Sequence, residues 1–265
     1  MSDRLITSLT NDTVKAVRAL HMRKERDATG RFLAEGLKFI GEALDQGRAP
    51  RLLLVGEDAR LHPILDRAKA DTRKTGGEVV TVTHAILEKI SRRENPQTVL
   101  GVFDQAYLPL SALVPHSAPC WVALEQVRDP GNLGTIIRTA DSAGCGGVIL
   151  IGDCVDPYSV EAVRATMGSV FAVSISKCTA TEFLAWRQTW PGSVVGTRLD
   201  ADQGYRDSAN QTPALILMGN EQAGLTDELA AACDINVKIP MRGRADSLNL
   251  AVATGIMVYA VTDAA

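Results

Sequence analysis

The pattern of apolar and polar positions near the C-terminus predicts a strand, a charged loop and a helix. Apolar and polar residues alternate over 235–239, which is typical of a short buried strand. Pro240 has no backbone N–H to donate, so we expect the strand to end there. Ser247 stands at the expected N-cap of a helix over 248–260, whose apolar positions recur at helical spacing. Asn249 is a poor helix former in the first turn, and its presence favours a functional site over a plain core helix.

Two other segments place polar residues where a strand or a helix meets a turn. Residues 215–218 predict an apolar strand that runs directly into a Gly-Asn-Glu turn over 219–221. Residues 132–143 predict a helix capped by Asn132 and stopped by Gly144. In open α/β sheets ligands bind at the strand ends, where glycine lets the backbone approach a flat group.

The rest of the pattern alternates helices and strands in both halves of the chain. In the first half we expect helices over 11–24, 37–44 and 61–70 and from Thr83, and strands over 51–55, 78–82 and 98–104. In the second half we expect strands over 121–124, 147–151, 169–175 and 194–197, a helix from Pro157, and a helix with a capping box of Thr179 and Glu182. Such alternation predicts an α/β fold with helices packed on a sheet.

A proline-containing stretch separates the two halves. Residues 107–119 show no clear periodicity, which indicates a linker. We therefore predict a smaller α/β domain over 1–107, a linker over 108–119 and a parallel-sheet α/β domain over 120–265. General rules favour an ordinary, unknotted sheet in the second domain, because true knots are rare.

Composition places the chain among soluble globular proteins. Hydrophobic residues make up 46% and charged residues 22% of the 265 positions. No apolar run approaches the roughly 20 residues that span a bilayer, and the N-terminus lacks the apolar core of a signal peptide. The five cysteines show no metal-ligand spacing: Cys120, Cys145, Cys154, Cys178 and Cys233. We therefore expect a cytoplasmic protein with reduced thiols, no metal and no membrane span.

Charge is distributed unevenly, although the net charge is only −3. Residues 1–107 hold 18 Lys and Arg against 15 Asp and Glu, whereas the remaining residues hold 10 against 16. The first half is therefore the better candidate for contacts with phosphate. Four of its cations lie around a turn expected at Gly30: Arg23, Lys24, Arg26 and Arg31. Taken alone, such a cluster is usually solvated surface.

Three segments together resemble the motifs of the SpoU/TrmH family of RNA ribose 2′-O-methyltransferases, within the knotted SPOUT superfamily. They are NLGTIIRTADSAG over 132–144, the strand that ends in Gly-Asn-Glu over 219–221, and IPMRGRADSLNLAVATGIMVYA over 239–260. The first domain resembles, more loosely, the ribosomal-protein-like substrate-binding domain of many family members. The resemblance alone implies a C-terminal trefoil knot and a homodimer.

The resemblance also implies S-adenosylmethionine as the cofactor and assigns the site residues. It places the cofactor on the backbones of Gly219, Ile239 and Leu248, with Thr197 beside it. It gives catalytic or positioning roles to Asn132, Arg138, Glu221, Ser247 and Asn249. It makes the basic cluster of Arg23, Lys24, Arg26 and Arg31 a clamp for the RNA backbone. Of second rank are Arg164 and Ser169, in a stretch similar to the intermediate region of the family.

The implied reaction needs help from the protein, because a ribose hydroxyl is a poor nucleophile at neutral pH. All four histidines precede the second domain, so we expect no histidine base there. Arg138 stays protonated, which favours orientation of a phosphate over proton removal, and the identity of the base stays open. Glu221 is expected either to pair with Arg138, to hold a motif loop through backbone N–H groups, or simply to cap the loop that follows it.

Ribosomal RNA is the expected substrate because of the additional first domain. A tRNA ribose methyltransferase is the alternative within the same class of enzyme. A non-catalytic RNA- or ribosome-binding factor that keeps the fold is the alternative outside it. The presence of Arg138, Glu221 and Asn249 favours the enzyme over that factor.

Overall fold

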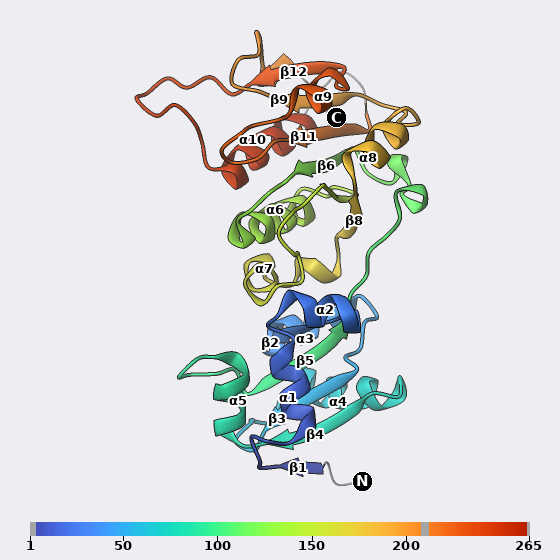
Figure 1. The fold of residues 1–265 in the computed structure, drawn as a ribbon. Helices are drawn as coiled ribbons and strands as arrows, with labels where there is room; N and C mark the ends of the chain where they lie inside the picture. Colours follow the sequence, from blue (N-terminus) through green and yellow to red (C-terminus); the bar gives the residue numbers. More distant parts are fainter. Residues whose placement is uncertain (1–3, 208–211, 264–265) are drawn as a thin grey trace. The chain divides into compact units, whose positions relative to one another are not determined.

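The structure, a computed structural model, describes residues 4–207 and 212–263. It divides into two compact units: unit 1 is Met1–Gln105 with Asp156–Ala172, and unit 2 is Ala106–Val155 with Val173–Ala265. Each unit is built on its own sheet (Figure 1). Residues 156–172 therefore pack with unit 1, although they lie inside the predicted domain 120–265. As domain limits, 1–107, 108–119 and 120–265 stay a prediction.

Unit 1 contains a five-stranded mixed sheet in the order β1-β4-β3-β5-β2. The strands are β1 Arg4–Ile6, β2 Arg31–Glu35, β3 Leu52–Gly56, β4 Glu78–Val82 and β5 Val99–Asp104. The helices are α1 Asp12–Ala19, α2 Arg23–Thr29, α3 Leu37–Asp45, α4 Pro63–Lys74, α5 His84–Ser91 and α7 Val160–Thr166, with the 3₁₀ turn η3 Ser169–Phe171. Strand β5 runs antiparallel to β2 and β3, and the other pairs are parallel. The sequence pattern did not predict β1 or β2.

An aromatic cluster joins segment 156–172 to the sheet of unit 1. Phe32 of β2 and Phe103 of β5 lie with ring centroids 5.9 Å apart. Tyr158 stacks on Phe32 at 4.7 Å, and Phe171 lies 4.8 Å from Phe103. Tyr158 is 1% exposed, so burial of these large rings stabilises the attachment of the segment.

The predicted continuous helix over 11–24 is wrong, because the chain turns between α1 and α2. Met22 has an extended backbone and precedes the first residue of α2. The carbonyl groups of Leu20 and His21 accept hydrogen bonds from Nη1 of Arg26, at 2.8 and 3.0 Å. A side chain thus satisfies backbone acceptors at the end of α1, and the helix need not continue.

Arg26 is buried, which corrects its assignment to an exposed RNA clamp. Its side chain is 4% exposed and its Nε lies 2.6 Å from Oδ2 of Asp156, which is equally buried. With its guanidinium engaged by this carboxylate and two carbonyls, Arg26 has no face left for a phosphate. The sequence around Arg26 could not predict its burial, because its partner Asp156 lies 130 residues away.

Unit 2 contains a seven-stranded sheet in the order β10-β12-β9-β11-β6-β7-β8, and every pair of neighbours is parallel. The strands are β6 Cys120–Glu125, β7 Gly147–Ile151, β8 Ser174–Cys178, β9 Val194–Thr197, β10 Gln203–Gly204, β11 Ala214–Met218 and β12 Ile235–Lys238. The helices are α6 Pro130–Ser142, α8 Ala180–Arg187, α9 Asp227–Ala231 and α10 Leu250–Thr262, with 3₁₀ turns η1 Leu110–Ala112, η2 Pro115–Ser117 and η4 Tyr205–Asp207. This confirms the predicted parallel-sheet α/β class; the knot stays an implication of the resemblance.

Helices cover both faces of the sheet in unit 2. One face carries the core cluster that includes Trp121, Ile149 and Leu215, packed with Phe183 of α8 and Leu229 of α9. Helices α6 and α10 lie side by side and contact strands β6, β7 and β11 (Figure 1). Because side chains alternate along a strand, the residues between those of the core cluster face α6 and α10.

Between 157 and 175 the helices and strands differ from those that the sequence pattern predicts. The predicted helix from Pro157 starts only at Val160, because the side chain of Ser159 caps it by accepting from the N–H of Ala162. The predicted strand over 169–175 is the turn η3 followed by β8, which begins at Ser174. The predicted capping box of α8 is present, since Thr179 and Glu182 exchange both hydrogen bonds.

Within 4–207 and 212–263 no helix is both long and apolar enough to cross a bilayer. In the same ranges, no three metal-binding side chains of His, Cys, Asp or Glu gather in one place.

Candidate active site

A pocket opens in unit 2 where strands β9, β11 and β12 end. Its empty space, including the open solvent at its mouth, is about 750 Å³. All four residues predicted to hold a cofactor line it: Thr197, Gly219, Ile239 and Leu248. Two residues predicted to act in catalysis, Glu221 and Ser247, line it as well. The pocket thus lies at the carboxyl ends of parallel strands, the usual ligand position in such sheets.

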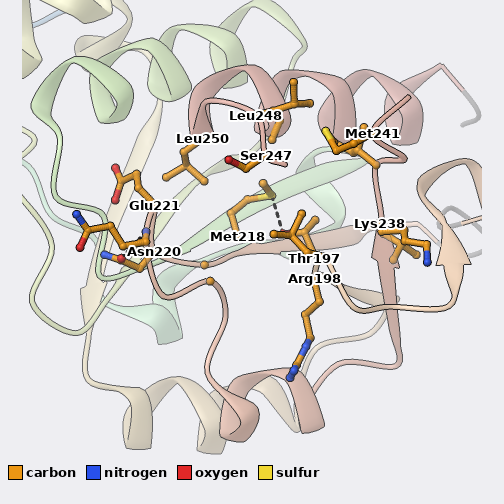
Figure 2. A pocket seen from close by; sticks show the side chains of 17 residues that line it. Thr197, Arg198, Met218, Asn220, Glu221, Lys238, Met241, Ser247, Leu248 and Leu250 are labelled. Atoms are coloured by element: carbon orange, nitrogen blue, oxygen red, sulfur yellow. Dashed lines mark hydrogen bonds between the residues drawn. The ribbon is translucent and has the colours of Figure 1, made fainter. Parts of the chain in front are cut away.

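The middle of the pocket is apolar and its ends are polar. Figure 2 shows Met218, Met241 and Leu248 around the middle, with Glu221 at one end and Lys238 at the other. Arg198 lines the pocket but turns its guanidinium away, toward Asp200 and Asp227, to which it donates hydrogen bonds of 2.7–2.8 Å. The hydrogen bond from Arg198 lowers the pKa of Asp200.

The loop over 239–248 presents unused backbone groups beside the pocket. Among the residues the structure describes, none forms a hydrogen bond with a backbone N–H or C=O of this loop. The neighbouring hydroxyl of Thr197 is already engaged, since it donates to the carbonyl of Leu217 at 3.1 Å and lies 3.3 Å from Sδ of Met218. Polar groups of a bound ligand would therefore meet the backbone of the loop first.

Gly219 is required by the turn that carries it. A Cβ atom at Gly219 would lie 2.0 Å from the N of Leu225 and 2.1 Å from the C of Gly224. The turn folds back because Asn220 and Gly224 exchange backbone hydrogen bonds of 3.0 and 2.9 Å. The interpretation of Gly219 as a turn glycine therefore holds, alongside its place in the pocket wall.

Three predicted site residues form a hydrogen-bond relay. The side-chain amide of Asn249 donates to Oδ1 of Asn132 at 2.9 Å, and the amide of Asn132 donates to Oε1 of Glu221 at 3.3 Å. The oxygen of Asn249 accepts from the N–H groups of Ala251 and Val252, which fixes the orientation of its amide. The relay thus joins the start of α10, the start of α6 and the turn after β11.

Two predicted helix caps are wrong. Asp129, not Asn132, caps α6, because its carboxylate accepts from the N–H of Asn132 at 2.6 Å and Pro130 occupies the first helical position. Asn249, not Ser247, caps α10. Capping and the relay use different atoms of Asn249, which explains why an asparagine stands in this position.

Glu221 holds the turn before α6 and does not pair with Arg138. Its carboxylate accepts from the backbone N–H groups of Arg128 and Asp129, at 3.3 and 3.4 Å. With the amide of Asn132, three donors converge on the two oxygens. Of the three roles expected for Glu221, the structure has the second, in which the carboxylate holds a motif loop.

Comparisons with known proteins agree with this geometry. Residues 119–259 match the SpoU rRNA Methylase family, and residues 11–101 match the MRM3-like substrate binding domain. The first match spans more than half of the chain. This chain belongs to the SpoU family.

Solved and curated relatives cover nearly the whole chain. An rRNA methyltransferase of Sinorhizobium meliloti, solved with AdoMet bound, is 47% identical, with 97% of this chain and 96% of that chain covered and a TM-score of 0.90. A 23S rRNA guanosine 2′-O-methyltransferase of Bacillus subtilis, RlmP, is 31% identical over 96% of this chain and 97% of its own. A 23S rRNA uridine 2′-O-methyltransferase of Streptomyces viridochromogenes is 30% identical over 89% and 84%.

Arg138, which the SpoU resemblance places in the active site, stands apart from the pocket of its own chain. It is exposed on α6 and is not among the residues that line the pocket. No ion pair or side-chain hydrogen bond to Arg138 occurs in the described parts of the chain. The described residues therefore give Arg138 no surface ion pair, which was the alternative role for this residue.

A second pocket of this SpoU domain, not expected from the sequence, is lined in part by residues 220–223 of the 219–224 turn. Gln126 and Arg128 line it together with Glu221. Gln126 has a φ of 48°, a left-handed conformation that is rare outside glycine, and its carbonyl accepts from Nδ2 of Asn220 at 2.7 Å. The signal for this pocket in the sequence was Asp-Pro-Gly at 129–131, where Asp129 caps α6 and also lines the pocket.

Among the basic cluster of unit 1, three residues remain exposed: Arg23, Lys24 and Arg31. Arg23 lies 3.7 Å from Asp27 and Arg31 lies 3.8 Å from Asp104, which are weak surface pairs. Arg164, of second rank, donates to both carboxylate oxygens of Glu35 at 2.8 Å within unit 1. Ser169 lies in η3 of the same unit, so neither second-rank residue lines the pocket.

Proposed function

We propose that this chain transfers the methyl group of S-adenosylmethionine to a ribose 2′-hydroxyl of ribosomal RNA. The observation that carries the proposal is the position of Glu221, which lines the pocket and also receives the end of the asparagine relay. A cofactor pocket and a set of fixed polar groups thus meet at one turn. This is what transfer between a bound donor and a positioned acceptor requires.

The pocket fits S-adenosylmethionine by its chemistry. Apolar side chains in the middle suit an adenosine ring and an aliphatic chain, and the unused backbone groups over 239–248 suit the polar atoms of an adenine. We assign its binding to the wall formed by Thr197, Gly219, Ile239 and Leu248. When bound, this cofactor supplies an electrophilic methyl group.

We assign the residues around the pocket to positioning the reactants, not to taking part in bond making. Both oxygens of Glu221 are occupied by three N–H donors, so we assign it to holding the turns around the pocket in place. Asn132 and Asn249 fix the starts of α6 and α10 against that turn. Ser247, whose Oγ lies 3.3 Å from Oδ1 of Asp246, stands at the pocket wall where the acceptor ribose enters.

We assign Arg138 to a phosphate next to the target ribose, and infer a homodimer that brings it to a pocket. Helix α10 is apolar on all sides, yet Val252 and Tyr259 are 53% and 45% exposed. A helix that is apolar all round is normally buried, so a second copy is the partner we propose for this face. Arg138, on the adjacent α6, would then face the partner's site. A sedimentation measurement tests this: Val252→Glu should give a monomer, and an unchanged dimer would contradict the assignment.

We assign the RNA-docking role to unit 1, through Arg23, Lys24 and Arg31. Phosphate contacts of this kind fix the position of an RNA without reading its sequence. Ribosomal RNA is preferred over tRNA because the family of the second domain and the relatives reported above are named for rRNA. Because ribosomal RNA is the proposed substrate, we also propose a cytoplasmic location. Relatives of similar identity are named for a guanosine and for a uridine, so the target base stays open.

Calorimetry with S-adenosylmethionine tests the cofactor assignment. Ala253 lines the pocket, so Ala253→Phe should fill it and abolish binding. Ala112→Phe makes the same change at an exposed alanine of η1 and should bind normally. If both variants fold and bind S-adenosylmethionine with equal affinity, this pocket is not the cofactor site.

A further inference from the structure

The cations of the second half of the chain divide into three groups by what they contact. Residues 108–265 hold ten Lys and Arg. Four of the ten form ion pairs with carboxylates: Arg128, Arg164, Arg187 and Arg198. Two more lie on or beside tyrosine rings: Lys177 on Tyr107 and Arg206 on Tyr205. In the described ranges, the remaining four form no ion pair or side-chain hydrogen bond: Arg138, Lys238, Arg242 and Arg244.

Three of these four free cations lie within seven residues of one another, next to the pocket. The segment 238–244 contains no acidic residue, although residues 108–265 as a whole carry 16 Asp and Glu against ten Lys and Arg. Lys238 lines the pocket and contributes weakly to lowering the pKa of Asp200, after the larger effect of Arg198. Among the described residues, Arg242 and Arg244 have no such counterpart.

The shape of the loop places the two arginines outside the pocket. The loop leaves β12 and returns to α10 as a long excursion from unit 2 (Figure 1). It touches the pocket at Met241 and again at Ser247 and Leu248, whereas residues 242–246 do not line it and are exposed. Arg242 and Arg244 are therefore exposed on the stretch of the loop that lies between its two contacts with the pocket wall.

We propose that Arg242 and Arg244 bind backbone phosphates of the RNA next to the ribose that enters the pocket. The proposal rests on the proposed function. A carboxylate of the bound cofactor is the other anion nearby, but the pocket wall that would enclose it does not include either arginine. Asp246, the single acid of 240–249, is engaged by the hydroxyl of Ser247 and leaves both guanidinium groups available. Guanidinium groups bind phosphate with paired hydrogen bonds, which suits alignment of a strand at a reaction site.

The test measures RNA binding and turnover of the full-length protein with Arg242→Ala, Arg244→Ala and the double variant. Lys177→Ala is the matched control. It removes an exposed cation of the edge strand β8 that already lies over the ring of Tyr107. The double variant should bind rRNA about tenfold more weakly. Its plot of log affinity against log salt should flatten by about one for each arginine removed. Changing both arginines to lysine should keep the salt slope and lose part of the affinity.

Three outcomes separate this proposal from the proposed function. If the unchanged protein methylates rRNA and the double variant matches Lys177→Ala in affinity and slope, the arginines are solvated surface and the proposal is overturned. If the double variant loses S-adenosylmethionine affinity in calorimetry but keeps RNA affinity, the arginines serve the cofactor and the proposal is equally overturned. If the unchanged protein transfers no methyl group to rRNA, the proposed function itself fails, whatever the variants do.

Discussion

The side-chain amide of Asn249 donates a hydrogen bond of 2.9 Å to Oδ1 of Asn132, a residue 117 positions earlier in the chain. The oxygen of the same amide caps α10, and the amide of Asn132 continues to Glu221. Two helix starts and the turn beside the pocket therefore depend on one orientation of one asparagine. Changes at Asn249 can separate its two roles.

Asn249→Asp should keep the cap and break the relay. The aspartate still accepts from the N–H groups of α10, but it presents an oxygen, not an N–H, to Oδ1 of Asn132. We expect a stability close to that of the unchanged protein and a fall in methyl transfer of at least tenfold. Asn249→Ala, by contrast, should also lose about 1 kcal/mol of stability, as cap removal usually does. Chemical denaturation and single-turnover transfer measure the two effects, and full activity in Asn249→Asp would show that the relay is not needed.

Arg26→Ala should destabilise the fold strongly. It leaves the buried carboxylate of Asp156 without its cation, a change that typically costs about 3–5 kcal/mol. Arg23→Ala, three residues earlier on α2 and exposed, should change the free energy of unfolding by less than about 0.5 kcal/mol. Urea denaturation of the two variants compares them directly. Similar small losses would mean that the Arg26–Asp156 pair does not form in solution.

Alkaline pH should destabilise unit 2 through two thiols. Burial raises the pKa of Cys178 from 9.0 to about 12, and burial likewise raises the pKa of Cys233 to about 12. Between these values the folded protein keeps protons that the unfolded chain releases, so the free energy of unfolding falls as pH rises from about 9 toward 12. Cys178→Ala and Cys233→Ala should each make this fall shallower. Parallel pH profiles for all three proteins would rule out a contribution from these thiols.

Arg138→Lys should fold, dimerise and bind S-adenosylmethionine, yet lose most methyl transfer. Lysine keeps the charge but not the planar pair of donors that aligns a phosphate. If oriented hydrogen bonds set the barrier, the loss should be on the order of a hundredfold or more. Arg138 forms no ion pair or side-chain hydrogen bond within 4–207 and 212–263, so we expect the change to leave the stability of the fold unaltered. Near-normal single-turnover rates would contradict the role proposed for Arg138 and would leave Glu221 and Asn249 as the candidates.

The cofactor-binding part of the site could be predicted from the sequence, because its residues lie in short motifs with a recognisable local pattern. The order of the motifs along the sequence predicted three cofactor-binding positions at strand ends and in the loop that follows β12. All three line the pocket: Gly219, Ile239 and Leu248. The helix caps went wrong by two or three residues, because Asn, Ser and Asp all cap helices and several of them stand near each start.

Long-range partners could not be predicted from local pattern. Arg26 looked like one member of an exposed cluster, but a carboxylate 130 residues away buries it. For the same reason, nothing local assigns Tyr158 and Phe171 to the sheet of unit 1. Gln126 has a left-handed backbone whose carbonyl accepts from Asn220 of the 219–224 turn, and that contact spans 94 residues.

Transfer of a labelled methyl group from S-adenosylmethionine to ribosomal RNA, followed by identification of the labelled nucleoside, tests the central claim most directly. The proposed function predicts label on a single ribose, recovered after alkaline hydrolysis in a dinucleotide, because a methylated 2′-oxygen cannot attack the neighbouring phosphate. It also predicts no transfer by Ala253→Phe and normal transfer by Ala112→Phe. Label on a base, or equal transfer by the two variants, would contradict it.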